Sequence, residues 1–553
     1  MQCERVIGGA GTGKTELLLS RMTELREQKG VEPHQIAFST FTRRGVEVMA
    51  KRAAGAWHVT PEELTCAGNF RTVHALAYRG LRVGRGQLLA GDSDSLEWIR
   101  RKCGIDLELQ QNADGGLECV PLQGAKGEGA AVLNAWFLSR NLCLPIRELI
   151  ERQRSAGDPA PSLDLIDELI PRYEAAKRLD KRFDFCDILA RYGGISFTID
   201  GVRLCQPEGE PPPGVLAYYF DECQDSSALI DRVCRRLAAA DGVRHVLLAG
   251  DPFQSLYGSF AGGDARHFQS WECTNQVIMP RSYRCPSAVL ALGEAVLQGM
   301  REGYWDRGIS PAEHDGGVSR AMSITAAIGD HLNPQENTLV VARCGHTLKK
   351  YAGELRRLGI PFEMMQDGPD TALLGLRALN SLASGEYIHS DDWAHARPLL
   401  RAKDDAGHKL VDQRAAEIWE SNFRDEVLHV RDIRAAGATP ALVGALERAE
   451  WLELLSPTVL EKADRWLAAC SRFGEDTATC PRVRLSTIHG AKGEEADTVL
   501  MSTETSKTVE RSRVNSIERH DEECRVAYVG VTRARKKLVV VQEACRHRML
   551  LPL

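Results

Sequence analysis

A glycine-rich segment near the start of the chain constrains the fold more than any other feature. It fits the pattern G-x-x-x-x-G-K-[ST], with an apolar run before it and a helix-length stretch after it. Its residues are Gly8, Gly9, Ala10, Gly11, Thr12, Gly13, Lys14 and Thr15. In such a strand–loop–helix the backbone N–H groups surround a phosphate, the lysine reaches the β and γ oxygens, and the threonine hydroxyl holds Mg²⁺. The motif therefore predicts a nucleotide site on an α/β sheet.

The segments around this loop alternate between strand and helix patterns. The predicted strands of this first set are residues 6–7, 36–39, 215–220 and 245–249, and the predicted helices are residues 15–28 and 42–54. Such alternation is typical of a parallel sheet covered by helices. From about residue 85 the pattern becomes helical, apart from a polar, glycine-rich stretch at residues 106–131 that predicts a loop. This change indicates a helical insertion in the first α/β unit.

A second α/β set begins near residue 276. Its predicted strands include residues 338–342 and 482–487, and a charged, mostly helical stretch at residues 375–475 separates them. The predicted fold class is therefore α/β, with two lobes built on parallel sheets and a mainly helical insertion in each. The predicted boundaries are residues 1–84 with 196–274 for the first lobe, 85–195 for its insertion, 275–374 with 479–553 for the second lobe, and 375–478 for its insertion.

Composition narrows the class of protein. The 553 residues exceed the usual size of one hydrophobic core, so several domains are expected. No apolar run is long enough to cross a bilayer, and the first twenty residues lack the layout of a signal peptide, so we expect a cytoplasmic protein with no membrane contact. The sixteen cysteines include no C-x-x-C pair and are expected to be reduced.

The charge pattern bears on nucleic-acid binding. A net charge of −6 argues against wrapping of nucleic acid by the whole surface, but it leaves room for a local basic groove. Between residues 507 and 537, nine Lys/Arg accompany five Asp/Glu. A solvated helix face explains this local excess equally well.

An acidic turn follows the apolar run V-L-A-Y-Y-F at residues 215–220. Asp221 is then expected at the carboxyl end of a sheet strand, where open α/β sheets bind their ligands. There Asp221 can hold Mg²⁺ and Glu222 can orient and deprotonate an attacking water. A merely solvated acidic turn is the alternative, and the glycine-rich loop favours the catalytic interpretation.

This turn, D-E-C-Q-D at residues 221–225, resembles the second motif of the UvrD/Rep-like superfamily 1 DNA helicases, D-E-x-Q-D. Later segments resemble further motifs in the order of that family, namely GDPFQSLYG (250–258), RSYRCP (281–286), VRLSTIHGAKGEEADTVLM (483–501) and EECRVAYVGVTRARKKL (522–538). The segments FSTFTRRGVEVMAKR (38–52) and RTVHALAYRG (71–80) resemble its DNA-contacting motifs, and DFCDIL (184–189) resembles another family segment. The resemblance covers both lobes.

The resemblance implies two RecA-like P-loop NTPase lobes and an ATP-driven motor. The implied activity is ATP-dependent movement along single-stranded DNA, 3′ to 5′, with unwinding of duplex. ATP and Mg²⁺ are the implied cofactors, and single-stranded and forked DNA and accessory replication, repair or recombination proteins are the implied partners. A single-stranded-DNA-stimulated ATPase that remodels nucleoprotein without unwinding is the alternative. A P-loop enzyme acting on small molecules would leave the fifth and sixth motifs unexplained.

The family's nucleotide contacts transfer to matching positions in this chain. The resemblance implies that Gln254 senses the γ-phosphate from the first lobe, while Arg284 and Arg533 supply cationic fingers from the second. Arginines of this kind contribute about 10³ to 10⁵ in rate in phosphoryl transfer. Tyr283 matches the tyrosine that stacks on the base, and Glu495 matches the acidic residue near the ribose.

The resemblance also implies residues that bind DNA. Phe41, Tyr257 and Phe260 are candidate stacking platforms, and such stacking contributes about 1–3 kcal/mol per base. Lone phenylalanines are more often core residues, so the motif context carries this interpretation. The resemblance assigns contacts with DNA phosphate or sugar to Thr72 and His74. It places His489 and Lys492 in the fifth motif, which in relatives links nucleotide state to the DNA track.

Two departures from the family pattern concern the base of the nucleotide. Only seven residues precede Gly8, and Gln2 lies too close to the loop to match the glutamine with which relatives read adenine. Glu16 stands where many relatives have a base-stacking arginine. We therefore expect loose nucleobase selectivity.

Another departure concerns strand separation. Relatives carry an aromatic hairpin after the sixth motif, whereas this chain continues after Lys537 with an apolar run, expected to be a buried strand, and a last segment without aromatic residues. Trp98, Trp136 and Phe137 are the alternative wedge candidates, although a core position is the stronger expectation for them. Unwinding is therefore expected to be weak, and the compact form would suit a phage or mobile element.

Overall fold

The computed structural model describes residues 2–105, 127–368, 370–422 and 426–552. The first lobe is built on a six-stranded sheet in which every strand pair is parallel. Its order across the sheet is β3 (Asn69–Phe70), β2 (Ile36–Ser39), β6 (Ala217–Phe220), β7 (His245–Gly250), β1 (Gln2–Ile7) and β8 (Asn275–Ile278). The predicted strands are thus confirmed, with ends that differ by a few residues.

Alternating side chains of this sheet fill two separate cores. Phe38 and Tyr219 pack beneath α1 (Lys14–Lys29) and α2 (Arg43–Trp57). Tyr218 and other residues of opposite orientation pack under helices on the other face, among them α3 (Val73–Leu81), α8 (Phe185–Gly193) and α9 (Ala228–Ala238). Because both faces are covered, the strands read as continuous apolar runs.

The second lobe repeats this design. Its parallel sheet has the order β11 (Glu363–Met364), β14 (Val483–Thr487), β10 (Thr338–Ala342), β15 (Ala496–Ser502), β16 (Ala534–Val541) and β9 (Gly317–Ala321). Helices α12 (Ser287–Gln298) and α22 (Ile517–Val531) contribute to the core of one face. Helices α13 (Ile324–His331) and α14 (Gly345–Arg357) contribute to the core of the other. The fold is therefore α/β with two parallel sheets, as predicted.

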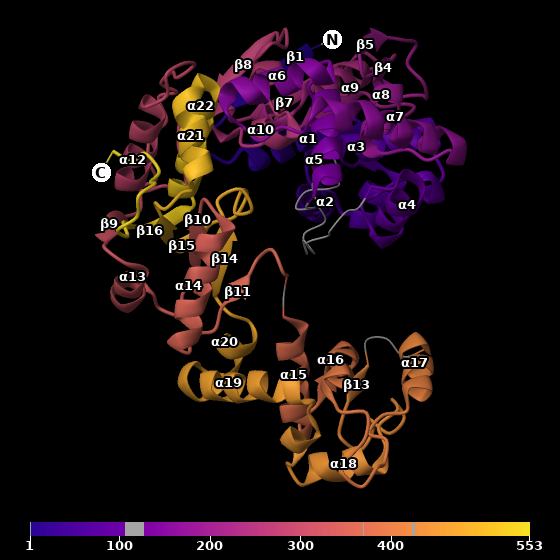
Figure 1. Ribbon diagram of the computed structural model, residues 1–553, viewed down its shortest axis with the longest axis vertical. Helices are drawn as coiled ribbons and strands as arrows, with labels where there is room; N and C mark the ends of the chain where they lie inside the picture. The colour runs from indigo at the N-terminus through magenta and orange to yellow at the C-terminus, as the bar shows by residue number, and fades with distance from the viewer. Residues whose placement is uncertain (1, 106–126, 369, 423–425, 553) are drawn as a thin grey trace.

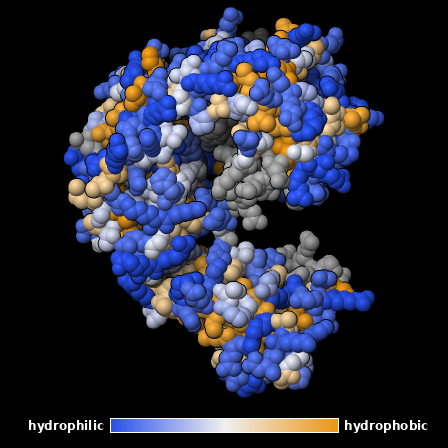
Figure 2. All heavy atoms as spheres, in the orientation of Figure 1, coloured by the Kyte–Doolittle hydropathy of each residue, from blue (hydrophilic) through white to orange (hydrophobic). Residues whose placement is uncertain are grey.

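Each lobe is accompanied by helices outside its sheet. In the first half these are α4 (Ser93–Cys103), α5 (Glu128–Asn141), α6 (Ile146–Ala156) and α7 (Leu163–Asp180), with the hairpin β4 (Ile195–Thr198) and β5 (Gly201–Leu204). In the second half they are α15 (Thr371–Ala383), α16 (Ser390–Ala396), α17 (Gln413–Asn422), α18 (Pro440–Glu447), α19 (Pro457–Phe473) and α20 (Glu475–Thr479), with the ribbon β12 (Ile388–His389) and β13 (Val427–Leu428). The second group has a core of its own and lies apart from the first lobe, across a broad hollow (Figures 1 and 2).

Several sequence predictions need correction. Residues 275–278, assigned to the second lobe, form β8 and pair with β1 in the first sheet. Residues 128–131, assigned to a loop, begin α5, while residues 106–126 lie outside the described part of the chain. Among the described residues, no helix is both long enough and apolar enough to span a bilayer.

The three aromatic residues considered as a wedge belong to the core. Trp98, Trp136 and Phe137 are 5%, 1% and 2% exposed. The indole N–H of Trp98 donates to Asp180 and that of Trp136 to Glu174. The core interpretation of these residues is confirmed, and the wedge role proposed for them is wrong.

A buried ion cluster joins helices of the first insertion. Asp184, the N-cap of α8, accepts from Arg140 Nη2 at 2.7 Å and from Lys177 Nζ at 2.7 Å. Asp187 accepts from the same two side chains at 2.9 and 2.6 Å. Burial favours the neutral acid, but the Arg140 and Lys177 charges outweigh it and hold the pKa of Asp184 well below its usual range. Because two protein cations already lie among these carboxylates, the cluster holds the helices together instead of binding a metal.

We predict that Asp184→Ala destabilises the protein by about 3–5 kcal/mol, because it removes one of the two carboxylates that Arg140 and Lys177 share in the interior and leaves their buried charges incompletely compensated. Urea unfolding followed by tryptophan fluorescence measures the change. Glu168→Ala is the matched control, since Glu168 pairs with Arg172 at 3.5 Å on the surface and its removal should cost less than about 0.5 kcal/mol. Equal costs for the two variants would contradict the assignment of stability to this cluster.

Candidate functional site

The glycine-rich loop connects β1 to α1 at the carboxyl end of the first sheet. Gly11 and Gly13 have φ of 67° and 83°, a conformation that favours glycine. The Lys14 ammonium donates to the carbonyl oxygens of Gly8 and Gly9 at 2.8 and 3.3 Å. The loop therefore folds around the lysine with the α1 N-terminus beside it, which is the arrangement that binds phosphate.

The acidic turn lies directly after β6, two strands away in the same sheet. The Asp221 backbone N–H donates to Ser39 at 2.8 Å, and Glu222 adopts a left-handed conformation with φ of 55°. Gln224 Nε2 donates to Glu222 Oε2 at 2.5 Å and so fixes the carboxylate. The two predicted acidic residues thus lie together in the place that the sequence indicated.

The two carboxylates of the turn are electrostatically different. Burial and the neighbouring Glu222 raise the pKa of Asp221 to about 7. Burial also opposes ionisation of Glu222, but the Lys492 and Lys14 charges outweigh it and lower its pKa. Glu222 is therefore ionised and able to accept a proton, while burial and the Glu222 charge favour the protonated form of Asp221.

The second lobe brings two arginines close to the glycine-rich loop and the acidic turn. Arg533 Nη2 donates to Gln254 Oε1 at 3.3 Å, although Arg533 is only 1% exposed. Burial and the nearby Arg284 lower the pKa of Arg533 to about 10. Arg284 itself donates through Nε to Glu495 Oε2 at 2.6 Å. The structure therefore brings Gln254, Arg284 and Arg533 together, as expected from the sequence.

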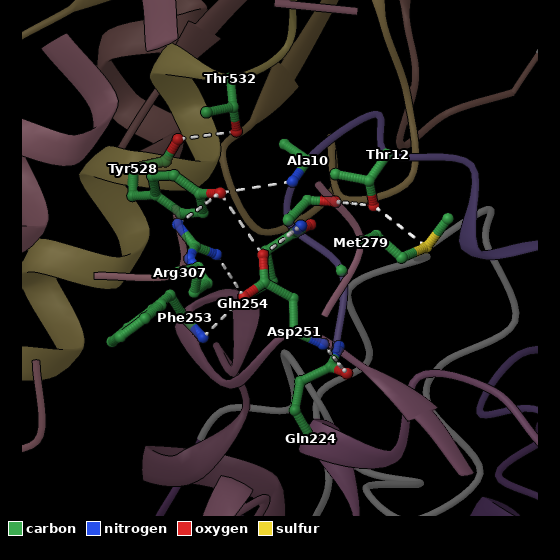
Figure 3. Close-up of polar contacts among 12 residues, drawn as sticks. Ala10, Thr12, Gln224, Asp251, Phe253, Gln254, Met279, Arg307, Tyr528 and Thr532 are labelled. Carbon is green, nitrogen blue, oxygen red and sulfur yellow. Dashed lines mark hydrogen bonds and ion pairs between the residues drawn. The ribbon is translucent and has the colours of Figure 1, made fainter. Parts of the chain in front are cut away.

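The two lobes meet at the glycine-rich loop through backbone contacts. Ser282 Oγ donates to the Ala10 carbonyl at 2.7 Å, and the Tyr283 N–H donates to the Gly11 carbonyl at 2.8 Å. The Ala10 N–H donates to the Tyr528 hydroxyl at 3.3 Å (Figure 3). A Cβ on Gly11 would lie 2.2 Å from Arg284 Cβ, so only glycine allows this approach.

The residues expected near the base and ribose lie at the rim of the cleft. Tyr283 is 68% exposed, and its ring lies about 4 Å from where a Cβ on Gly13 would be. Glu495 pairs with Arg284 and also with Arg535 at 2.9 Å. Glu16 is exposed and lies 3.7 Å from Arg52. The Tyr283 ring is thus open to a base, and the ribose contact of Glu495 stays a prediction.

Two of the expected DNA-stacking residues stack on one another. The rings of Phe41 and Tyr257 are parallel within 7°, with centroids 5.6 Å apart. The Lys492 ammonium lies 5.0 Å from the Tyr257 ring centroid. The Phe260 side chain lies outside the described part of the structure. The structure thus brings Phe41 and Tyr257 together, while their contact with DNA stays a prediction.

The remaining predicted DNA ligands lie deeper. Thr72 caps α3 by accepting from Ala75 N at 3.2 Å and is 4% exposed. His74 is 6% exposed and meets Phe185 edge-on at 5.7 Å. Burial and the Arg343 charge lower the pKa of His489 to about 3, so its ring is neutral. Thr72 and His74 need a rearrangement to reach DNA, and all three roles stay predictions.

Sequence reasoning missed Arg307 and did not single out its partner Asp251. The side chains of both are fully buried, and Arg307 Nη1 lies 2.7 Å from Asp251 Oδ1 (Figure 3). Arg307 lies in an irregular segment outside every quoted motif, and no sequence signal marks it. Asp251 lies in the segment GDPFQSLYG, and this position in a family motif could have singled it out.

Comparisons with known proteins agree with this geometry. Residues 3–275 match the family model described as the UvrD/REP helicase N-terminal domain, and residues 467–544 match the UvrD-like helicase C-terminal domain. The chain is 24% identical to the ATP-dependent DNA helicase UvrD2 of Mycobacterium tuberculosis, over 97% of this chain and 76% of the relative. It is 22% identical to a probable DNA helicase II homolog of Rickettsia felis, over 98% and 90% respectively. It is also 24% identical to the ATP-dependent DNA helicase PcrA of Leuconostoc citreum, over 54% and 37%.

We predict that Gly11→Ala lowers the rate of ATP hydrolysis about 100-fold, since a methyl group there displaces Arg284 from the cleft. Gly30→Ala is the matched control: Gly30 has a similar φ of 64° at the end of α1, with nothing within 4 Å of its added Cβ. It should cost about 1–2 kcal/mol of stability and leave hydrolysis unchanged. The account of the lobe contact fails if both variants hydrolyse ATP at the same rate.

Proposed function

The chain belongs to the UvrD/Rep-like family of helicases, and on that premise we propose that it hydrolyses ATP to move 3′ to 5′ along single-stranded DNA and to separate duplex strands. One observation carries the proposal: the charges of Lys14 from the first lobe and Arg533 from the second both act on Glu222, and Arg284 of the second lobe lies against the glycine-rich loop at Gly11. A site divided in this way makes hydrolysis depend on how the lobes are placed. The family polarity supports the direction of movement.

The cleft offers each group that phosphoryl transfer requires. Lys14 neutralises the β and γ oxygens, and Glu222, held by Gln224, accepts the proton of the attacking water. Arg284 and Arg533 stabilise the charge that develops on the transferred phosphoryl group. No covalent intermediate with the protein is needed, because positioning and charge supply the catalysis.

The donor set fits Mg²⁺. Thr15 offers a hydroxyl oxygen and Asp221 a carboxylate, the hard oxygen ligands that this ion prefers. Burial and the Glu222 charge raise the pKa of Asp221 to about 7, although Lys14 and Lys492 act in the opposite direction, and a divalent ion would stabilise such a carboxylate. Thr15 and Asp221 would hold the ion, which would supply positive charge to the phosphate groups.

Lys492 links the nucleotide cleft to the candidate DNA track. It reaches from the second lobe to the Gln254 carbonyl at 2.7 Å, to Glu222 at 3.9 Å and to Asp225. The same ammonium lies over the ring of Tyr257, which stacks on Phe41. A change in lobe spacing on hydrolysis therefore acts on the aromatic pair, and a base that enters this stack would move with it.

The proposed partners follow from this track. Single-stranded and forked DNA are the substrates, and accessory replication or repair proteins are the expected protein partners. We place the protein in the cytoplasm, where these substrates and ATP occur together. Phe41 and Tyr257 provide the proposed stacking platform, and Thr72, His74 and His489 lie in the motifs beside it.

A second candidate function is remodelling of nucleoprotein by translocation without efficient unwinding. The burial of Trp98, Trp136 and Phe137 favours it, because none of the three can act as a wedge. A forked duplex with a 3′ single-stranded tail, assayed beside a translocation assay on single strands, separates the two. Rapid unwinding by the purified protein alone supports the helicase, and translocation with little unwinding supports the remodeller. Movement from 5′ to 3′ would contradict the proposed direction.

We predict that Lys14→Ala, Glu222→Gln and Arg284→Ala each lower multiple-turnover ATP hydrolysis by about 10³-fold or more, since they remove phosphate clamping, water activation and charge stabilisation. Glu222→Gln should still bind ATP. Arg281→Ala is the control for Arg284→Ala, because Arg281 pairs with Glu313 at 2.7 Å on the surface. Hydrolysis by Glu222→Gln near the wild-type rate would show that another group activates the water.

We also predict loose nucleobase selectivity, with GTP and CTP hydrolysed within about tenfold of ATP, because Tyr283 offers a π-face that any base can stack on. Glu16 lies 3.7 Å from Arg52 and offers no stacking surface, so a base would stack on Tyr283 from one side only. The kcat/KM for each nucleotide, measured on wild type and Tyr283→Ala, tests this. A strong preference for ATP that survives Tyr283→Ala would mean that another segment reads the base.

A further inference from the structure

Arg307 lies between α12 and β9, in a segment without regular structure. Its guanidinium contacts three groups: Asp251 Oδ1 at 2.7 Å, Glu294 Oε1 at 2.5 Å and the Tyr528 hydroxyl at 3.3 Å. It also lies 4.6 Å from the ring centroid of Phe253. Figure 3 shows the side chain pointing into the junction of the lobes, between the Tyr528 ring and the turn at Asp251.

Asp251 belongs to the first lobe and organises the turn that carries Gln254. Its Oδ1 accepts from Phe253 N at 3.1 Å, and its Oδ2 accepts from Gln254 Nε2 at 2.8 Å. The Asp251 N–H donates to Gln224 Oε1 at 3.0 Å, and the amide of Gln224 holds Glu222. The position of Asp251 therefore affects both Glu222, the carboxylate proposed to activate water, and Gln254, the amide expected at the γ-phosphate.

Tyr528 joins the same network from α22 of the second lobe. Its hydroxyl accepts from Ala10 N in the glycine-rich loop at 3.3 Å and donates to Asp251 Oδ2 at 3.4 Å. Arg307 contacts this hydroxyl and Asp251 together. The guanidinium thus lies where the phosphate loop, the turn before Gln254 and the second lobe meet.

We infer that Arg307 is a positioning residue for ATP hydrolysis, which holds Asp251 so that Gln254 and Glu222 face the γ-phosphate when the lobes close on the nucleotide. This inference rests on the proposed function. The Arg307 side chain is fully buried, and it acts through its contacts with Asp251 and Tyr528. Arginine suits the position because its planar fork donates to three acceptors at once, whereas the compact ammonium of lysine cannot match that geometry.

A purely structural role predicts a different result. Removing a buried arginine destabilises the interior whatever its part in catalysis, so loss of activity alone decides nothing. A positioning role predicts that folded variants bind nucleotide normally and turn it over slowly. The separation of KM from kcat, and recovery in a conservative variant, distinguish the two roles.

The test compares Asp251→Asn, Arg307→Met, Arg307→Lys and the double variant Asp251→Asn/Arg307→Met in the full chain, below their unfolding temperatures. We expect kcat for ATP to fall about 100-fold in Arg307→Met, with KM within about threefold of wild type. The kcat of Arg307→Lys should be about tenfold higher than that of Arg307→Met. The double variant should be about as slow as Arg307→Met alone, because the two residues act as one unit. Arg357→Ala, which removes a surface ion pair with Glu354, is the control.

Other results would overturn either the inference about Arg307 or the proposed function. Wild-type kcat in Arg307→Met overturns the inference and leaves the proposed function intact. If Arg307→Met does not fold, Arg307→Lys decides, and a folded Lys variant with wild-type kcat also overturns the inference. Multiplicative losses in the double variant would show that Arg307 does not act through Asp251. A wild-type protein that hydrolyses no ATP, with or without DNA, overturns the proposed function itself.

Discussion

The close approach of the second lobe to the glycine-rich loop is the contact on which the rest of the site depends. Gly11 lacks a Cβ, so Tyr283 can donate its N–H to the Gly11 carbonyl, and Arg284 lies where a Cβ would have been. Without this approach the arginines of the second lobe would stand away from Lys14 and Glu222. The proposed nucleotide site is thus a property of the junction and belongs to neither lobe alone.

The same junction explains how chemistry can become movement. Arg533 meets Gln254 across it, and Lys492 crosses it to Asp225 and Glu222 while lying over the Tyr257 ring. A nucleotide that enters must share these partners, so binding and release act on contacts that the protein already makes. The aromatic pair therefore lies one side chain away from Glu222, the carboxylate proposed to activate water, and no long pathway is required.

The sequence predicted the positions of the strands better than the contacts between segments that are distant in the chain. Residues 36–39 and 338–342 formed the expected strands, because both-face burial makes them continuous apolar runs. The strand at residues 275–278 was assigned to the wrong lobe, since its exposed edge position gives it a polar pattern, N-Q-V-I, and only pairing with β1 reveals its sheet. Motif resemblance indicated Glu222, Gln254, Arg284 and Arg533, and the structure brings these side chains together, while their catalytic roles stay predictions. The sequence did not indicate Arg307, because its proposed role depends on contacts between residues distant in sequence, and no local pattern predicts such contacts.

The rate of ATP hydrolysis with and without single-stranded DNA tests the central claim most directly. If the lobes couple the nucleotide to a DNA track through Lys492 and the Phe41–Tyr257 pair, single strands should raise kcat at least tenfold in the wild type. That stimulation should be lost when Phe41 and Tyr257 are both replaced by alanine, while basal hydrolysis persists. A hydrolysis rate that single-stranded DNA leaves unchanged in the wild type would contradict the account.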